Sequence, residues 1–205
     1  MPKTQIIFIH GGNCFDTQEK YLQYLQNKEY NPFEIKSHWK NYLAAELGEW
    51  VTFFAPEMPC MRNAQYIAWK VWFKKLFPYL VNEPVILIGH SLGTVFLAKY
   101  LSEDWFPKMI QAIHLVWSVF DGEDIDDEDM ADFILQPKLL ASVEELTTNI
   151  HLYHSTDDES CPWKNVEKYQ QYFPHAVLHK FTDRWHFRQS EFPELLEQIQ
   201  KEISL

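Results

Sequence analysis

Short apolar runs alternate along the chain with segments whose apolar residues recur every three or four positions. Such runs are typical of buried strands, and such segments are typical of amphipathic helices. Their alternation indicates βαβ units, which build a parallel sheet covered by helices. We predict strands at 5–9, 50–53, 85–88, 112–117, 150–153 and 176–181. We predict helices at 36–47, 64–77, 92–102, 163–172 and 191–203.

Two of these elements have especially clear patterns. Residues 85–88 read Val-Ile-Leu-Ile without polar alternation, as expected of a central strand covered on both faces. Residues 191–203 have one apolar stripe at helical spacing. Its members are Phe192, Leu195, Leu196, Ile199 and Ile203. The sequence therefore predicts a three-layer αβα sandwich around a doubly wound, mostly parallel, six-stranded sheet.

Two segments follow this scheme less closely, and neither marks a domain boundary. Residues 13–35 are polar and aromatic, and we expect one additional short helix there. Residues 121–132 are strongly acidic but lack the ligand spacing and central glycine of an EF-hand calcium loop. A solvated acidic loop is the favoured interpretation, and we expect residues 1–205 to form one domain.

Composition and charge limit the classes of partner and location. Hydrophobic residues make up 46% of the 205 residues, which is enough for one domain with a substantial core. The net charge of −11 argues against nucleic acid and membrane surfaces as binding partners. The apolar run that begins at residue 6 is too short for a signal-peptide core or a membrane span. Three widely spaced cysteines, Cys14, Cys60 and Cys161, favour reduced thiols. We therefore expect a cytoplasmic protein.

The sequence Gly-His-Ser-Leu-Gly at 89–93 is a candidate nucleophile turn. It matches Gly-x-Ser-x-Gly, follows a predicted strand and opens a predicted helix, which is the context the motif requires. Small residues on both sides let the strand and the helix approach closely, and the hydroxyl of Ser91 stands at the tip of the turn. An ordinary glycine-bounded turn is the alternative, but the placement favours Ser91 as a nucleophile.

Backbone donors for an oxyanion are expected beside this turn. The sequence His-Gly-Gly-Asn at 10–13 follows the first predicted strand, where esterases carry a glycine-rich loop. We predict an oxyanion hole formed by the N–H groups of Gly12 and Leu92, with Asn13 as the alternative to Gly12. A phosphate-binding turn is disfavoured because both G-x-G-x-x-G and GK[ST] are missing.

The acid and the base of a triad are expected after the fifth and sixth strands. Asp158 follows the strand at 150–153 and precedes Pro162 by four residues, so we prefer it to Asp157 and to Asp121. His186 lies on the loop before the last helix and is the predicted general base, with an ordinary pKa near ~6.5.

The remaining histidines do not predict a metal site. His151 and His154 are three residues apart on a predicted strand and therefore face opposite sides, which argues against a shared metal ion.

Several segments of the chain resemble a known family. The similar segments are 85–101 with its Ile-Leu-Ile-Gly-His-Ser, 155–164, 178–187 and, more weakly, 56–80. They resemble the serine hydrolase family of YdeN and retinoblastoma-binding protein nine. The resemblance implies the α/β-hydrolase fold and a Ser, Asp, His triad, and it supports the second aspartate of the 157–158 pair. Trp185 replaces the glycine that family members have before the histidine, and no L-x-C-x-E motif is present, so retinoblastoma protein is not expected as a partner.

The sequence thus predicts a serine hydrolase that cleaves a small ester through an acyl-serine intermediate, without a metal or an organic cofactor. Trp117, Trp163 and Trp185, together with Phe120, lie near predicted strand ends, where they could line a substrate pocket or belong to the core. A thioesterase or amidase with the same triad is an alternative, as is a non-catalytic protein-binding module on the same fold. A monomer that takes a small-molecule ester is the expected form.

Overall fold

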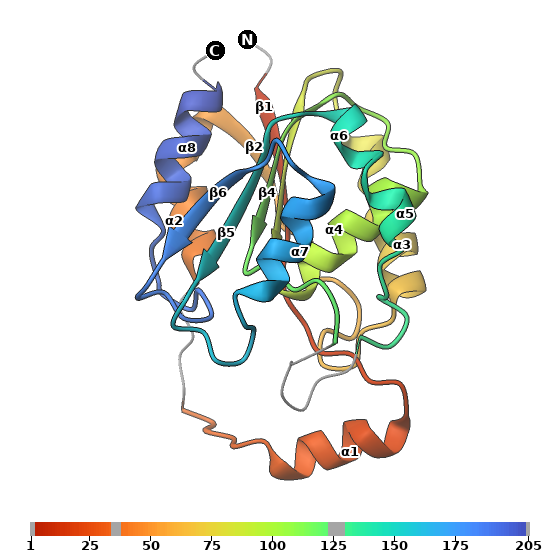
Figure 1. Cartoon of the computed structure of the whole chain (residues 1–205). Helices are drawn as coiled ribbons and strands as arrows, with labels where there is room; N and C mark the ends of the chain where they lie inside the picture. Colours follow the sequence, from red (N-terminus) through yellow and green to blue (C-terminus); the bar gives the residue numbers. More distant parts are fainter. Residues whose placement is uncertain (1–2, 34–37, 123–129, 204–205) are drawn as a thin grey trace.

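Six runs of apolar residues form one parallel sheet in the order β2-β1-β3-β4-β5-β6 (Figure 1). The computed structural model describes residues 3–33, 38–122 and 130–203. The strands are β1 (Thr4–Ile9), β2 (Val51–Phe54), β3 (Val85–His90), β4 (Ile110–Val116), β5 (Ile150–Ser155) and β6 (Val177–Phe181). Each predicted strand is present, and the expected six-stranded sheet is confirmed.

Helices cover both faces of this sheet (Figure 1). One layer contains α2 (Trp39–Leu47) and α8 (Pro193–Ile203), which contact each other. The other layer contains five helices, and its members are α3 (Tyr66–Lys74), α4 (Leu92–Glu103), α5 (Pro137–Leu140), α6 (Val143–Leu146) and α7 (Lys164–Tyr172). The predicted three-layer αβα arrangement is therefore confirmed.

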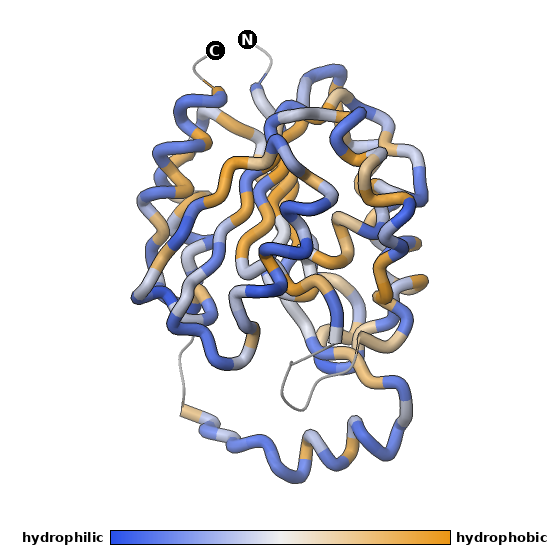
Figure 2. Tube along the Cα trace, in the orientation of Figure 1, coloured by the Kyte–Doolittle hydropathy of each residue, from blue (hydrophilic) through white to orange (hydrophobic). Residues whose placement is uncertain are grey.

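The core lies on both faces of the central strands. All six residues of β3 are buried, as its unbroken apolar sequence predicts. Apolar residues follow the strands and the inner sides of the helices in Figure 2, and polar residues occupy the outer sides. On α8, the buried residues include Leu195, Leu196 and Ile199, three members of the predicted stripe.

Several short elements differ from the sequence prediction. The additional helix expected within 13–35 is α1 (Gln18–Asn27), which lies beyond the carboxyl ends of the strands and buries none of its residues (Figure 1). Two four-residue helices, α5 and α6, were not predicted because one turn is too short to show helical periodicity. Single 3₁₀ turns, η1 (Gly48–Trp50) and η2 (Phe77–Tyr79), follow α2 and α3. Most of the acidic loop, residues 123–129, lies outside the described residues.

The order of the strands places a crevice at the carboxyl edge of the sheet. From β1 the chain passes to β2 on one side and later to β3 on the other, so β1 and β3 flank the point where the winding reverses. Ligands of open α/β sheets bind outside the carboxyl ends of the strands at such a point. The loop at 10–13 directly follows β1, and Ser91 directly follows β3. Among the residues described, every helix is too short or too polar to cross a lipid bilayer.

Candidate active site

Ser91 occupies a strained turn between β3 and α4. Its φ of 56° and ψ of −125° are sparsely populated for a residue with a side chain, and it directly precedes the first turn of α4. The N–H of Ser91 donates to the carbonyl of Val116 at 3.0 Å, which ties the turn to the end of β4. Surrounding structure therefore holds the backbone in a conformation that it would not adopt alone.

The glycines around Ser91 are required by close backbone approach. A Cβ atom on Gly93 would lie 2.2 Å from the carbonyl oxygen of Ile9. A Cβ atom on Gly11 would lie 2.8 Å from the Cβ of Ser91 and 3.1 Å from its Oγ. The structure thus brings the 10–13 loop directly against Ser91, and only glycine fits at both contacts.

Two backbone N–H groups beside Ser91 are free to donate. The Gly12 and Leu92 amides have no hydrogen-bond acceptor in the described part of the chain. The amide of Asn13 instead donates to the carbonyl of Met61 at 2.8 Å, so the N–H of the alternative donor is already engaged. The ring of His10 holds the same loop, because its Nε2 accepts a hydrogen bond from the Met58 amide at 2.8 Å.

Asp158 is buried and accepts several hydrogen bonds at the carboxyl end of β5. Its Oδ1 accepts from the amides of Ser160 and Cys161 at 2.9 and 3.1 Å. Its Oδ2 accepts from Nε1 of Trp117 and lies 3.8 Å from Nδ1 of His186. Among the aspartates considered from the sequence, this carboxyl is the one paired with His186 in the structure.

The other two candidate carboxyls have different partners. Asp157 is exposed, and its Oδ1 accepts from the Ser155 hydroxyl and from the Trp185 amide at 3.0 Å. These hydrogen bonds lower the pKa of Asp157, with that from Ser155 contributing most. Asp121 forms an ion pair with Lys168 at 2.5 Å.

His186 lies on a strained loop between β6 and α8. Its ring packs against Trp117 with the ring centroids 3.6 Å apart, and the residues on either side, Trp185 and Phe187, have φ angles of 42° and 52°. In the described residues, six side-chain-bearing positions have positive φ, and Ser91, Trp117, Trp185 and Phe187 are four of them. Strain of this kind concentrates at functional sites.

Ser91 and His186 are close but not hydrogen-bonded to each other. His90, the neighbour of Ser91, donates from Nε2 to the carbonyl of His186 at 3.3 Å. No hydrogen bond joins the Ser91 hydroxyl to the His186 ring in the described structure. Catalytic hydrogen bonds are often long in ligand-free enzymes and tighten when substrate binds.

The environment of His186 keeps its ring neutral at neutral pH. Burial lowers the pKa of His186 to about 3, and the positive charges of Arg188, His154 and Lys28 act in the same direction. This differs from the ordinary value near ~6.5 that the sequence alone suggests, because burial penalises the imidazolium.

The aromatic residues predicted for a substrate pocket have separate surroundings. Trp117 is buried between Asp158 and His186. Trp163 begins α7 and packs against Lys180, whose Nζ lies 4.8 Å from the ring centroid. Trp185 is exposed, with the Arg188 guanidinium 4.7 Å from its ring centroid.

A cavity of about 510 Å³ lies elsewhere, beside the 10–13 loop. Its lining residues are Tyr21, Cys60, Met61, Arg62, Asn63, Gln65 and Ala68. It adjoins the loop because the carbonyl of Met61, a lining residue, accepts from the Asn13 amide. The sequence did not indicate this cavity, since its lining comes from α1 and from the turn before α3.

Solved structures with the same fold define the class of protein. The product of the ydeN gene from B. subtilis matches with a TM-score of 0.73 and 16% identity, covering 99% of this chain and 100% of that one. Est1E from Butyrivibrio proteoclasticus matches with a TM-score of 0.57 and 14% identity, covering 99% and 89%. The fold, with a serine turn between β3 and α4, is that of the α/β-hydrolases.

The sequence places the chain within this class. A family model described as serine hydrolase matches residues 33–200, so the chain belongs to the serine hydrolase family. Serine hydrolase RBBP9 from Rattus norvegicus is 28% identical over 123 residues. That match covers 60% of this chain and 63% of the relative, which is less than two thirds of its length. The family resemblance read from the sequence is confirmed.

Proposed function

We propose that the chain hydrolyses a small carboxylic ester through an acyl intermediate on Ser91. The observation that carries the proposal is the position of the strained Ser91 turn beside two free amides, Gly12 and Leu92, and near His186. The 3.8 Å approach of His186 Nδ1 to Asp158 supports a triad of these three side chains.

Each group has a defined step in this reaction. His186 takes the proton of Ser91 as the hydroxyl attacks the ester carbonyl, and the Gly12 and Leu92 amides donate to the oxyanion. Protonated His186 then gives its proton to the departing alcohol, leaving acyl-Ser91. His186 next takes a proton from water, whose oxygen attacks the acyl group. The bond from the acyl carbon to Ser91 then breaks, His186 returns the proton to the serine oxygen, and the acid is released. Asp158 stabilises the imidazolium that forms in each half of the cycle.

Two observations favour a small ester as the substrate. A structure from work on carboxylesterases of Nitrososphaera gargenis shares the fold, with a TM-score of 0.64 and 11% identity, and Est1E is described with ferulic acid bound. The cavity of about 510 Å³ beside Gly12 has the volume of a small-molecule site. We propose that this cavity receives one side of the ester.

Covalent labelling tests the nucleophile. A fluorophosphonate probe should label the wild-type protein and Ser102→Ala, a control on the same helix, while Ser91→Ala should remain unlabelled and fully folded. Equal labelling of wild type and Ser91→Ala would contradict the proposal.

A substrate comparison tests the bond that is cleaved. Matched p-nitrophenyl esters, thioesters and anilides of short acyl groups should show the highest kcat/KM for the ester. Higher turnover of the thioester or the anilide would assign the same triad to a thioesterase or an amidase. If the protein binds a partner but hydrolyses none of these three kinds of substrate, it is a binding module.

A further inference from the structure

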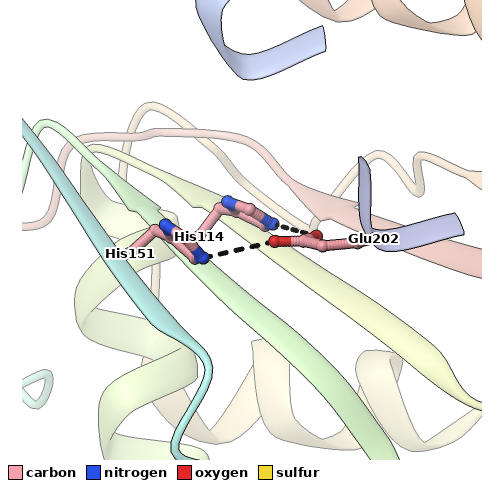
Figure 3. A group of neighbouring side chains, drawn as sticks. All are labelled: His114, His151 and Glu202. Atoms are coloured by element: carbon pink, nitrogen blue, oxygen red, sulfur yellow. Dashed lines mark hydrogen bonds and ion pairs between the residues drawn. The ribbon is translucent and has the colours of Figure 1, made fainter. Parts of the chain in front are cut away.

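A second group of buried polar side chains lies between the sheet and the last turn of α8. His114 on β4 and His151 on β5 are paired in register, and Glu202 on the last turn of α8 reaches them (Figure 3). His151 is the second residue of β5, whereas Asp158 follows the opposite end of that strand. All three side chains are buried.

Each imidazole points a ring nitrogen at the carboxylate of Glu202 (Figure 3). The Nε2 of His114 lies 2.9 Å from one carboxylate oxygen of Glu202, and the Nε2 of His151 lies 3.2 Å from the other. One ligand atom from each residue falls within 4.8 Å of the other two. Ligand atoms roughly 2.1 Å from a tetrahedral metal ion are separated by roughly 3.4 Å, so small side-chain shifts would suffice.

Outer hydrogen bonds orient both imidazoles. Nδ1 of His114 is hydrogen-bonded to the Tyr153 hydroxyl at 3.1 Å, and Nδ1 of His151 to Nε2 of His179 at 2.9 Å. Histidines that ligate metals almost always have such a partner on the second ring nitrogen, which fixes the tautomer and the ring orientation. Both rings are thereby held with Nε2 toward Glu202.

The charge of Glu202 is only weakly compensated. Its ion-pair partners within the described structure are the two imidazoles, with neither a lysine nor an arginine. Its neutral donors include the side-chain amides of Gln198 at 2.9 Å and Asn149 at 3.4 Å. A buried negative charge is costly unless a cation compensates it, and a divalent ion would do so.

We propose that His114, His151 and Glu202 bind one divalent transition-metal ion, preferentially Zn²⁺. Two imidazoles and a carboxylate suit zinc and are a poor set for calcium or magnesium, which take oxygen ligands. Asn149 offers a further oxygen, since its Oδ1 lies 2.8 Å from Nε2 of His151. Because all three ligands are buried and Glu202 lies on the last turn of α8, the ion is structural and fastens the end of α8 to the sheet.

The spacing of His151 and His154 did not reveal this group. Those two residues do face opposite sides of β5, where Nε2 of His154 donates to the carbonyl of Cys161 and His151 faces His114. The second imidazole comes from the neighbouring strand, which depends on the order and register of the sheet.

Metal binding is measured on the full chain after treatment with a chelator. Equilibrium dialysis against ZnCl₂ should give one bound zinc ion per chain, and zinc at about 100 times its Kd should raise Tm by about 5–10 °C. Co²⁺ in place of zinc should give the visible absorption of a tetrahedral nitrogen and oxygen site.

Variants assign the bound ion to these residues. His151→Gln and Glu202→Gln should lose the bound equivalent, the cobalt absorption and the rise in Tm. His175→Gln and Cys60→Ser are matched controls, because His175 is an exposed histidine paired with Glu144 and Cys60 is an exposed thiol. Both controls should keep all three signals.

Glu202→Gln keeps a hydrogen-bonding side chain of the same shape, and circular dichroism checks its fold. If wild type binds no zinc, or folded Glu202→Gln still binds one equivalent, the proposal is overturned. Loss of binding in either control variant would also overturn it. Labelling of Ser91 is measured on the same samples and reports separately on the hydrolase proposal.

Discussion

Trp117 shows how one side chain connects the parts of the candidate site. Its indole N–H donates to Asp158, and its ring lies against His186. Its position directly after β4 is readable from the sequence, but this contact is not, because the chain separates Trp117 from Asp158 by 41 residues. We therefore propose Trp117 as a positioning residue for the acid and the base, while its role in a substrate pocket stays a prediction.

Trp117→Phe removes the donor and keeps an aromatic ring. A hydrogen bond to a charged group contributes about 1.5–3 kcal/mol, so we expect kcat to fall roughly tenfold or more while KM changes little. Steady-state kinetics with a p-nitrophenyl ester measures both constants. Trp50→Phe is the control, because Trp50 is 77% exposed and should leave both unchanged. Wild-type kcat in Trp117→Phe would show that the indole N–H has no positioning role.

Burial, assisted by the charge of Arg188, sets the pH range in which His186 can act as a base. Burial, Arg188 and two further positive groups hold the pKa of His186 at about 3. Protonated His186 cannot accept the serine proton, so activity is lost as pH falls through this pKa. We expect kcat/KM of the wild type to persist well below pH ~6.5, the ordinary histidine value.

Arg188→Gln removes a positive charge and should raise the pKa of His186. The acid limb of the kcat/KM profile should then move to higher pH, which a profile between about pH 2 and pH 7 would measure. Lys201→Gln removes a positive charge at the far end of α8 and should not move it. An acid limb that is identical in Arg188→Gln and wild type would contradict this assignment.

At the scale of elements, the approach of α4 to the end of β1 fixes the serine turn. Gly93 lies where any Cβ would meet the carbonyl oxygens of Ile9 and His10 at 2.2 and 2.8 Å. Both are backbone atoms, so neither can rotate aside as a side chain could. The first turn of α4 and the 10–13 loop can therefore be close only with glycine at this position.

Gly93→Ala should destabilise the protein by about 3 kcal/mol and abolish fluorophosphonate labelling, because the backbone must shift at the serine turn. Gly48→Ala is the matched control, since Gly48 has a φ of 47° with nothing within 4 Å of an added Cβ. The free energy of unfolding of Gly48→Ala should fall by only about 1 kcal/mol, because alanine is less stable than glycine at a positive φ. The fluorophosphonate probe should still label this variant. Urea denaturation gives both free energies of unfolding. Equal losses would contradict the steric argument.

At the scale of the whole molecule, ion pairs between helices make stability depend on pH. Asp104, at the end of α4, pairs with Lys70 and Lys74 of α3, the latter at 2.9 Å. Burial raises the pKa of Asp104, but the hydrogen bonds and charges of the two lysines outweigh it, and its pKa is lowered. The stabilisation is therefore present above the unfolded-state pKa near ~3.9 and is lost as pH falls through the lower folded value.

Asp104→Asn should reduce the free energy of unfolding by about 1 kcal/mol at neutral pH, since the pairs are partly exposed. The difference from wild type should shrink below about pH 4. Urea denaturation at several pH values measures it. Asp183→Asn is the control, because Asp183 is 73% exposed and 3.6 Å from Arg184, and it should change stability little. A difference that grows toward acid pH would contradict the linkage.

The sequence was most informative where structure depends on neighbours along the chain. The six strands, the buried character of β3 and the stripe of α8 all follow from local apolar periodicity. The strand ends were less certain: β3 continues two residues beyond its predicted end, to His90. The apolar run stops at Ile88, but the ladder continues through Gly89 and His90, which pair with β4.

The candidate site was predictable in part for the same reason. Ser91 and the 10–13 loop are marked by glycines whose spacing reflects a local turn. The spacing to Pro162 already favoured Asp158 over its neighbour Asp157, and the structure adds the different hydrogen-bond partners of the two carboxyls. From the sequence, Gly12 was the preferred donor and Asn13 its alternative, and the structure shows the Asn13 amide donating to the Met61 carbonyl.

By itself, the sequence determined the alternation of strands and helices, the serine turn and membership of the serine hydrolase family. Only the tertiary structure decided that Asp158 approaches His186, that Trp117 lies between them, and that His114 meets His151 and Glu202. Periodicity and turn conformation depend on residues that are neighbours in the sequence, whereas these contacts join segments that are distant in the sequence. Their distances depend on strand order, register and helix packing, which emerge only when the whole chain has folded.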